Sequence, residues 1–475
     1  MHNIIKQISF LGLALILGSC SVGPDYERPT VVVPEQFKEA SKDWKIAEPQ
    51  EDNIDCKWWE VFNDPVLNDL EEQLDISNQT IVSFEAQYRQ AIALVDQAIA
   101  AYFPTIGANS AITRQKLSQN ASTSTFTTSP KPFTDYTASL TATWAPDLFG
   151  VVRRNVEAFE DAAEASEAQL AGARLTAQAS LAQIYFQLRT LDVIQKALDD
   201  TVASYEKTLT LTKNRFAQGV AGQSDVLLSL SLLQSAQAQA IDNKILRDQY
   251  EHAIAVLIGE APANFTLDCN KSNLNPPSIP LLLPSELLER RPDIAQTERL
   301  VAQANANIGL AVAAYFPLLN LGATGGYDSH IFATWFSAPA LFWSIGPQLT
   351  ATLFDGGLRD AKLEGAEATY DQTVANYRQT VLTAFQDVED NLTSLNILKD
   401  EAKVQDAALA TSRKALEILL NQYKSGTASM SDVITAEVNT FAAQKNALTI
   451  AGRRMTAAVG LIKALGGGWK VPPTN

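Results

Sequence analysis

The pentapeptide Ala-Ala-Tyr-Phe-Pro occurs twice in the chain, at residues 100–104 and 313–317. Before the first copy, apolar residues recur every three or four positions from residue 64 to about 101, which is the spacing of an amphipathic helix. After it, over residues 136–144, apolar residues alternate with Thr and Ser, which is the period of a strand with one apolar face. The pentapeptide therefore marks a change from helix to strand.

The second copy of the pentapeptide is followed by the same change. Apolar residues alternate with small or polar ones over residues 319–327 and again over residues 343–353. The match continues beyond the pentapeptide, because Leu-Thr-Ala-Thr occurs at 140–143 and at 349–352, each time followed by Leu-Phe and a glycine. The chain is therefore predicted to consist of two tandem copies of one structural unit.

A long helical pattern follows each pair of predicted strands, over residues 148–216 and about 358–423. Each pattern ends in a glycine-containing break, RFAQGVAGQSDV at 215–226 and QYKSGTASMSDV at 422–433, and a return helix closes each copy. Equivalent residues of the two breaks lie 207 positions apart: Gly219 and Gly426, Ser224 and Ser431, Asp225 and Asp432.

The first long helical pattern, 69 residues from 148 to 216, corresponds to a helix about 100 Å long. Such a helix is far longer than one that packs around a compact core. Ala is abundant between residues 158 and 179, which allows neighbouring helices to approach closely in a coiled-coil sheet. An extended structural coiled coil would explain the helices alone, but it would not explain strands with an apolar outer face.

The predicted strands have the length and alternation of transmembrane β-strands, although the edge of a soluble β-sandwich alternates in the same way. Four strands cannot close a barrel, and a sheet in a membrane cannot leave an edge open. The barrel must then be shared between chains. Two chains would give eight strands with an interior filled by side chains, whereas three would give twelve strands and a lumen.

The N-terminus, MHNIIKQISFLGLALILGSC, contains an apolar stretch over residues 8–18 that is too short to span a bilayer as a helix. It is typical of a signal peptide. Leu-Gly-Ser-Cys at 17–20 resembles a lipobox, in which Cys20 becomes the lipidated first residue, and Ser21 in place of Asp implies sorting to the outer membrane. The alternative is an unmodified thiol beside an ordinary cleavage site. Residues 21–62 are Pro-rich at their start and are predicted to be an extended tether.

Composition excludes several classes of function. The chain has 475 residues and a formal charge of −16, and it contains no basic run of five or more, which argues against nucleic acid as a partner. The three histidines, His2, His252 and His330, form no motif of a catalytic or metal site, so neither an enzyme nor a cofactor or metal is expected. Cys56 and Cys269 lie far apart and could form a disulfide or remain two thiols.

Several stretches resemble the TolC-like outer-membrane efflux factors, in particular the lipoprotein branch that serves RND-type pumps. The stretch LPSELLERRPDIAQTERLVAQANANIGLAVAAYFP at 283–317 is highly specific, and the resemblance covers essentially the whole mature chain. The other stretches that carry it are LGSCSVGPDYERP at 17–29, WWEVFNDPVLNDL at 58–70, LFDGG at 353–357 and the two breaks ending in Ser-Asp-Val.

This resemblance implies a mainly α-helical fold with a membrane β part, in which a coiled-coil helical barrel continues into a shared transmembrane β-barrel. It implies a homotrimer in the outer membrane with a large periplasmic portion, a periplasmic adaptor (membrane-fusion) protein and an inner-membrane RND pump as partners. The protein would be a passive exit duct for small toxic compounds or drugs. Pro104 and Pro317 would end helices where the helical tunnel meets the barrel.

The resemblance places the two breaks at a closed periplasmic tip, with Asp225 and Asp432 ringing the lumen and Gly219 and Gly426 in the turns. Tyr423 falls at the Tyr position of a family Tyr/Arg latch. Ala428 occupies the latch Arg position and Thr435 the second aspartate position, so the closing contacts depart from the family pattern. The alternative role of both aspartates is to complement the helix dipole beside an N-cap Ser, Ser224 or Ser431.

Two other functions remain open from the sequence: a type I secretion channel for polypeptides, and a structural or adhesive surface lipoprotein. The predicted segments are a signal peptide at 1–19, a lipid-anchored extended segment at 20–62, a first repeat at 63–262 with strands within 104–146, a linker at 263–284, a second repeat at 285–467 with strands within 317–354, and a tail at 468–475.

Overall fold

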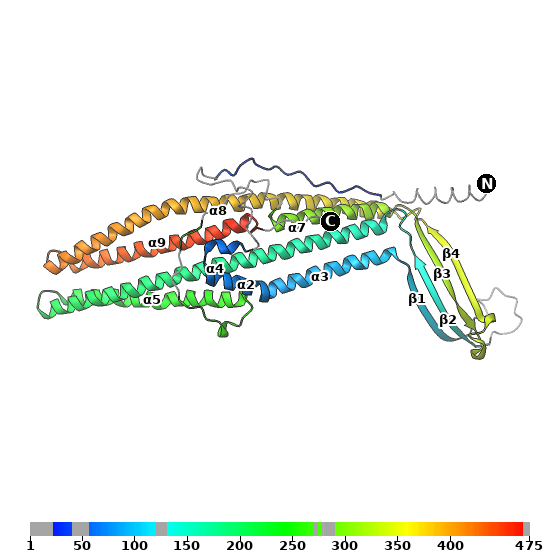
Figure 1. Ribbon diagram of the computed structural model, residues 1–475, viewed down its shortest axis with the longest axis horizontal. Coiled ribbons are helices and arrows are strands. Elements are labelled where there is room, and N and C mark those ends of the chain that lie inside the picture. The colour runs from blue at the N-terminus through cyan, green and yellow to red at the C-terminus, as the bar shows by residue number, and fades with distance from the viewer. Residues whose placement is uncertain are drawn as a thin grey trace. The chain divides into compact units, whose positions relative to one another are not determined.

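The computed structural model describes residues 22–39, 57–116, 118, 131–269, 274–277, 279 and 290–468 (Figure 1). Cys20 and Cys56 lie outside the described residues, so the acylation of Cys20 stays a prediction. Cys269 is exposed and forms no disulfide with any described residue. Along the described part of the chain, no helix combines the length and the apolar composition that crossing a bilayer requires.

The elements follow one order twice: a helix, two strands, a very long helix and a return helix. This confirms the predicted tandem repeat and the mainly helical fold with four strands. The elements are η1 Trp58–Phe62, α2 Pro65–Ser77, α3 Gln79–Ile99, η2 Ala100–Tyr102, β1 Thr105–Gln115, β2 Phe133–Trp144, α4 Val151–Ala217, α5 Gln223–Leu257, η3 Pro262–Asn264, α7 Pro292–Ala313, β3 Leu318–Ser329, η5 Phe332–Thr334, η6 Ala338–Ala340, β4 Leu341–Thr350, α8 Leu358–Ser425 and α9 Met430–Ala464.

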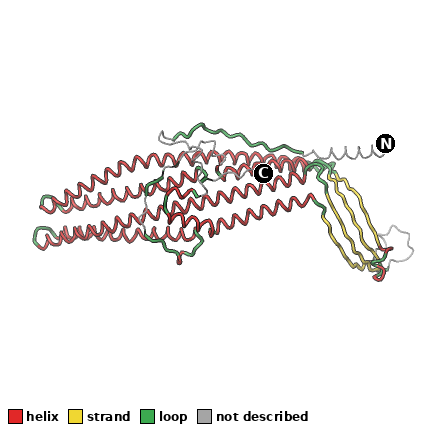
Figure 2. Tube along the Cα trace, viewed as in Figure 1, coloured by secondary structure: helices red, strands yellow, loops and turns green. Residues whose placement is uncertain are grey.

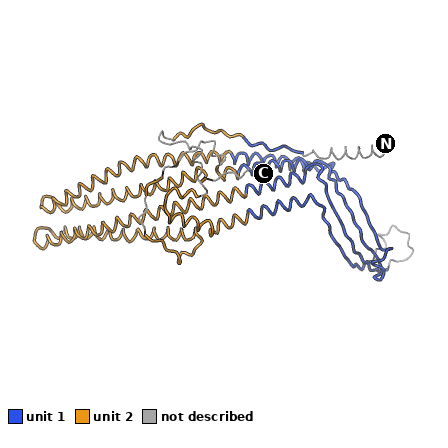
Figure 3. Tube along the Cα trace, in the orientation of Figure 1, with its two compact units in different colours: residues 1–29, 88–165, 297–377 blue, residues 30–87, 166–296, 378–475 orange. Residues whose placement is uncertain are grey.

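The chain divides into two compact units, which are coloured in Figure 3 and are treated one at a time below. Unit 1 comprises residues 1–29, 88–165 and 297–377, and unit 2 comprises residues 30–87, 166–296 and 378–475. Unit 1 contains the sheet and most of α7, and unit 2 contains η1, α2, α5 and α9.

The sheet of unit 1 has four strands in the order β1-β2-β3-β4, and all neighbours are antiparallel (Figure 2). The strand register aligns the predicted apolar positions of the four strands with one another, and likewise the predicted polar positions. One row of directly paired residues is Ile106, Ala142, Ala323 and Ile345, and the adjacent row is Gly107, Thr141, Thr324 and Ser344. Because directly paired residues point to the same side of a sheet, one face is apolar and the other is small and polar. The predicted alternation is confirmed.

The last strand ends earlier than the alternation predicted. β4 stops at Thr350, whereas the apolar pattern continues to residue 353. The last pair of the ladder joins Thr350 to Leu318, and Leu318 is preceded by Pro317, which has no N–H to donate. The strand therefore ends where its partner ends.

The first helical pattern is interrupted, although its apolar spacing runs on continuously. Asn78 separates α2 from α3, and its Oδ1 accepts hydrogen bonds from the backbone N–H groups of Thr80, at 2.9 Å, and Ile81, at 3.0 Å. The Asn78 side chain also donates to the carbonyl of Leu257 at the end of α5, at 2.7 Å. A side-chain cap and a tertiary contact therefore end α2 and begin α3.

Unit 2 has a core of aromatic and aliphatic side chains at the level of η1 and α2. Trp59, Tyr185 and Phe186 are all fully buried there. The Asp64 side chain caps α2 by accepting from the N–H groups of Val66 and Leu67, and it also accepts a hydrogen bond from the Tyr185 hydroxyl at 2.8 Å. The stretch that begins the first helix is thus fixed to the middle of α4.

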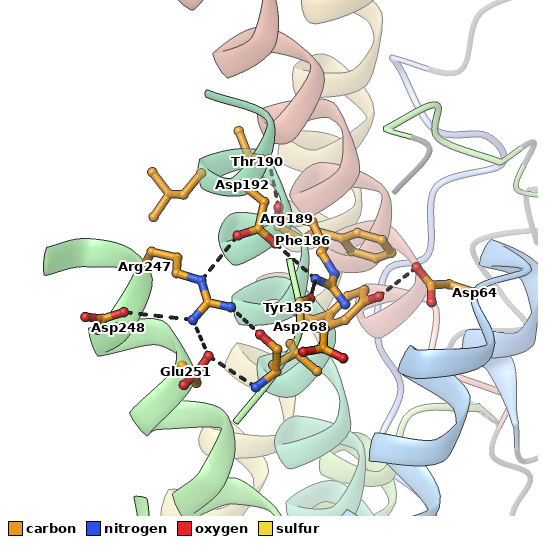
Figure 4. Close-up of polar contacts among 12 residues, drawn as sticks. Asp64, Tyr185, Phe186, Arg189, Thr190, Asp192, Arg247, Asp248, Glu251 and Asp268 are labelled. Carbon is orange, nitrogen blue, oxygen red and sulfur yellow. Dashed lines mark hydrogen bonds and ion pairs between the residues drawn. The ribbon is translucent and has the colours of Figure 1, made fainter. Parts of the chain in front are cut away.

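A buried ionic network beside this core holds the chain that follows α5 (Figure 4). Asp192 of α4 accepts hydrogen bonds from Arg189 at 3.0 Å and from Arg247 of α5 at 3.2 Å. Arg189 also donates to the carbonyl of Asp268 at 2.6 Å, and Arg247 donates to the carbonyl of Leu267. The start of the predicted linker between the repeats is therefore bound to α4 and α5.

Candidate functional site

The two long helices end in turns of the same geometry, at one end of unit 2 (Figure 1). After α4, Gly219 adopts a left-handed φ of +77° and its N–H donates to the carbonyl of Phe216 at 2.9 Å. After α8, Gly426 has φ +83° and its N–H donates to the carbonyl of Tyr423 at 3.0 Å. An added Cβ would meet open space at both positions, so the left-handed backbone is what these turns require of glycine.

The two predicted tip aspartates occupy the third position of the return helices. Asp225 Oδ2 accepts from the backbone N–H of Gly222 at 3.3 Å, and Asp432 Oδ2 accepts from the N–H of Ser429 at 3.1 Å. The hydrogen bond that Ser429 Oγ donates to Asp432, at 2.6 Å, holds the pKa of that carboxyl below its usual range. Both carboxylates therefore cap helix N-termini.

The capping residues differ from those expected. The N-caps are Gly222 and Ser429, whose backbones are extended, and Ser224 and Ser431 already lie inside the helices. A carboxylate at the third position of a helix can accept a hydrogen bond from the backbone N–H of the N-cap residue. The serine directly before each aspartate is the second residue of the helix and therefore cannot be the N-cap. The Asp residues thus act in the capping arrangement, but with partners three residues upstream.

Tyr423 is buried and is held by an arginine of the other turn. The guanidinium of Arg215, near the end of α4, lies 4.6 Å from the centroid of the Tyr423 ring. Arg215 Nη1 also donates to the carbonyls of Tyr423, at 2.9 Å, and Lys424, at 3.2 Å. Cation–π attraction and charge-assisted hydrogen bonds therefore join the ends of α4 and α8 within one chain.

The residues at the family's other latch positions make different contacts. Ala428 is half-buried in the turn between α8 and α9. Thr435 is exposed, and its hydroxyl donates to the carbonyl of Ser431 in its own helix at 2.9 Å. Arg215 contacts Tyr423 although Ala428 occupies the predicted Arg position.

A buried carboxyl lies farther along the same helices. Glu437 of α9 accepts a hydrogen bond from the Thr208 hydroxyl of α4 at 2.9 Å, and its other oxygen has no hydrogen-bond partner among the described residues. Burial raises the pKa of Glu437 to about 7. Tyr205 of α4 is affected by this carboxyl, because burial, followed by the charge of Glu437, raises the pKa of Tyr205.

Sequence reasoning missed Arg215, Thr208 and Glu437. A basic residue in the last turn of a helix was visible in the sequence, but its target on α8 lies 208 positions away. The repeat gave one further signal, because Glu437 stands where the first repeat has Leu230. Among the described residues, no group of three or more His, Cys, Asp or Glu side chains is arranged to hold a metal ion.

Pro104 and Pro317 each lie between a helical element and a strand. Pro104 lies between η2 and β1, and Pro317 directly precedes β3. Exposed aromatic side chains surround these positions in unit 1: Phe103, Tyr102, Trp144, Tyr315 and Phe316.

Comparison with known proteins gives one consistent result for this architecture. The family model described as outer membrane efflux protein matches residues 70–260 and 283–467. Over 481 residues the chain is 32% identical to outer membrane protein OprJ of Pseudomonas aeruginosa, covering 97% of this chain and 96% of the relative. It is 29% identical over 471 residues to the probable efflux pump outer membrane protein TtgC of Pseudomonas putida, covering 97% and 95%.

Solved structures show the same fold. The outer-membrane channel OprN superposes with a TM-score of 0.88 at 28% identity, over 95% of this chain and 100% of that chain. The open state of the Neisseria gonorrhoeae outer membrane channel MtrE superposes with a TM-score of 0.82 at 27% identity, over 96% and 100%. The match to the family model spans both repeats of this chain and both turns. This chain therefore belongs to the outer membrane efflux protein family.

Proposed function

We propose that three copies of this chain combine their sheets into one outer-membrane barrel and form the exit duct of a tripartite efflux system. The observation that carries the proposal is the sheet itself. It has four strands, and in the described chain β1 and β4 each pair on one side only. Its apolar face is exposed, with Trp343 at 74% and Ile345 at 75% of full exposure. An exposed apolar face is stable against lipid, but an unpaired strand edge is not, because its backbone N–H and C=O groups would have no hydrogen-bond partner in the membrane.

Three chains supply twelve strands, three times the four of one chain, and a barrel of that size encloses a lumen. The helices would continue the lumen as a tunnel, with the turns after α4 and α8 at its closed periplasmic end. In this arrangement Asp225 and Asp432 lie close to the narrow mouth, and a ring of carboxylates there would favour cations. The domain boundaries given above and the acylation of Cys20 belong to the same proposal.

The proposed cargo is small toxic compounds, and the proposed partners are a periplasmic adaptor and an inner-membrane RND-type pump that supplies the energy. Among the relatives, ArpC is named for efflux of antibiotics, TtgC for efflux of toluene and CusC for efflux of cations, so cargo differs among related proteins. We assign the chain no catalytic step, because a duct of this kind needs only a selective, gated passage.

Native mass spectrometry and planar-bilayer recording of the purified protein test the duct. We expect an assembly of three chains that passes ions, and replacing both Asp225 and Asp432 by Ala should alter single-channel conductance and cation block. Unchanged conductance and block would leave the aspartates with the capping role only. A monomer that passes no ions would contradict the duct itself and would favour a structural surface protein.

Deletion of the gene separates the two transport functions. We expect greater susceptibility to toxic small molecules, with unchanged levels of secreted protein. Unaltered susceptibility together with lost secretion would instead identify a type I secretion channel.

A further inference from the structure

The residues that follow the predicted lipidation site lie in a built site on unit 1. Residues 22–26 run as an extended segment over α4 and α7, and every contact described below is within unit 1. One wall of the site comes from the first repeat and the other from the second.

Arg154, in the first turn of α4, is the centre of this site. Its side chain is 4% exposed, and its guanidinium donates to the carbonyl of Val22 at 3.2 Å and to that of Gly23 at 3.4 Å. It also forms an ion pair with Asp25 at 3.0 Å, while Glu157 of the same helix holds the guanidinium from the other side at 2.8 Å. Because the N–H donors of a guanidinium have a fixed planar geometry, a buried arginine bonded in this way favours one specific path of the bound backbone.

Two glycines allow the segment to approach α7. Gly23 has a φ of +96°, and a Cβ added to it would lie 2.5 Å from the Cα of Gly309. A Cβ added to Gly309 would lie 2.8 Å from Cδ of Arg154. Neither position has room for a side chain, so the close packing depends on glycine at both.

The segment is held at its far end by α7 as well. Asn305 donates to the carbonyl of Pro24 at 3.1 Å, and the Tyr26 hydroxyl donates to Glu298 at 2.5 Å. Burial, followed by the hydrogen bond to Glu298, raises the pKa of Tyr26. The contacts therefore extend along residues 22–26 rather than resting on a single ion pair.

We propose that Arg154, Asn305, Glu298 and Gly309 form a clamp for the chain's own N-terminal segment, which fixes the point at which the lipid of Cys20 enters the membrane. The docking is independent of acylation, whereas the anchoring role rests on the lipidation in the proposed function. Cys20 precedes Val22 by two residues, and two residues span at most about 7 Å. The acylated residue is thereby confined to the vicinity of the clamp.

The position of the clamp suits this role. Arg154 lies in the first turn of α4, soon after β2, and Gly309 lies in the last turns of α7, just before β3. Aromatic side chains gather at these helix-to-strand changes, among them Phe149 and Phe316, which stack at 4.9 Å. Aromatic residues of membrane β-proteins concentrate at the bilayer interface. The clamp would thus hold the lipid at the height where acyl chains enter the leaflet.

The rate at which Glu-C cleaves the full-length protein after Glu27 tests the clamp, because the protease needs the segment to leave its site. Arg154→Met and Gly309→Ala should each accelerate cleavage about tenfold or more, since hydrogen bonds to a charged group are lost or displaced. The matched controls are Arg153→Met, an exposed neighbour, and Gly365→Ala, a helical glycine whose Cβ would meet open space. Both controls should stay within about twofold of wild type, as surface substitutions usually do.

Two further variants keep the test decisive. Asp25→Asn changes a side chain that is 95% exposed, so it cannot unfold the body, and it should accelerate cleavage less than Arg154→Met does. Cys20→Ala, secreted with an ordinary signal peptide, should be cleaved as slowly as wild type. Equal rates for Arg154→Met and Arg153→Met, or fast cleavage of Cys20→Ala, would overturn the clamp. Mass spectrometry of the released wild-type peptide should find acyl groups, and their absence would overturn the anchoring role without affecting conduction.

Discussion

The turn after α4 and the turn after α8 share a backbone but not an environment. Gly219 and Gly426 adopt the same left-handed conformation. The side chains at equivalent positions differ, because Phe216 is 47% exposed whereas Tyr423 is 3% exposed. The comparison shows that a sequence repeat preserves local turn geometry, while contacts between the repeats decide which turn is held. In this chain α4 holds the second turn through Arg215, and it holds the helix that follows, α9, through Thr208.

The largest expected difference between the repeats lies at Glu437, which replaces the Leu230 of the first repeat. The pKa of Glu437 is about 7 in the folded chain, whereas an unfolded Glu titrates at about 4.3. Between these values the native state binds more protons than the unfolded state, so stability falls as pH rises to about 7 and stays low above it. Glu437→Gln should therefore raise the unfolding free energy by about 3 kcal/mol at pH 8 and hardly at all at pH 4.

Thermal unfolding of the detergent-solubilised protein at both pH values measures this effect. Glu206→Gln, an exposed glutamate on α4, is the control and should leave the pH dependence unchanged. A Tm difference between Glu437→Gln and wild type that is the same at both pH values would contradict the buried-carboxyl assignment.

The next effect concerns the arginine that joins the turns. Arg215→Met should lower the unfolding free energy by about 2 kcal/mol, because the charge-assisted hydrogen bonds and the contact with Tyr423 are lost. Lys213→Met, an exposed neighbour, should cost less than about 0.5 kcal/mol. If the turns form the proposed gate, Arg215→Met should also raise single-channel conductance. Equal Tm values for the two variants would show that Arg215 does not hold the second turn.

A smaller and symmetrical effect is expected at the two turn glycines. Gly219→Ala and Gly426→Ala should each cost about 1–2 kcal/mol, because a Cβ is disfavoured in the left-handed region. Asn at either position should cost less, since it tolerates that conformation better. Thermal unfolding of the four variants distinguishes backbone strain from packing, and a large inequality between the two Ala variants would contradict the shared geometry.

The smallest expected effect separates the two helix caps. Ser429→Ala should destabilise by about 1 kcal/mol, whereas Gly222→Ser should stabilise by a few tenths of a kcal/mol. Ser429→Ala removes the serine cap from the second turn, and Gly222→Ser places a serine cap at the first turn. Guanidinium unfolding monitored by circular dichroism can measure the change in unfolding free energy of both variants. Destabilisation by Gly222→Ser would show that the two N-caps are not interchangeable.

Local patterns predicted much of this molecule because the relevant physics is local. The change of period at residues 100–104 and 313–317 distinguishes helix from strand, since each period places apolar side chains on one face. Gly219 and Gly426 could be placed in turns because only glycine adopts a left-handed backbone without cost. The break between α2 and α3 at Asn78 could also have been predicted, because Asn is a favoured N-cap residue. It was not predicted because the apolar spacing continues across it.

Local patterns did not predict which polar side chains are buried or which distant residues are in contact. The sequence by itself determined the two repeats, the strand faces and the positions of the turns, because these follow from neighbours a few residues apart. Only the tertiary structure decided that Arg215 reaches Tyr423, that Glu437 is buried and that Arg154 encloses residues 22–25. Each of these contacts joins residues more than a hundred positions apart, and the periodicity of a helix gives no information about which distant surface will cover it.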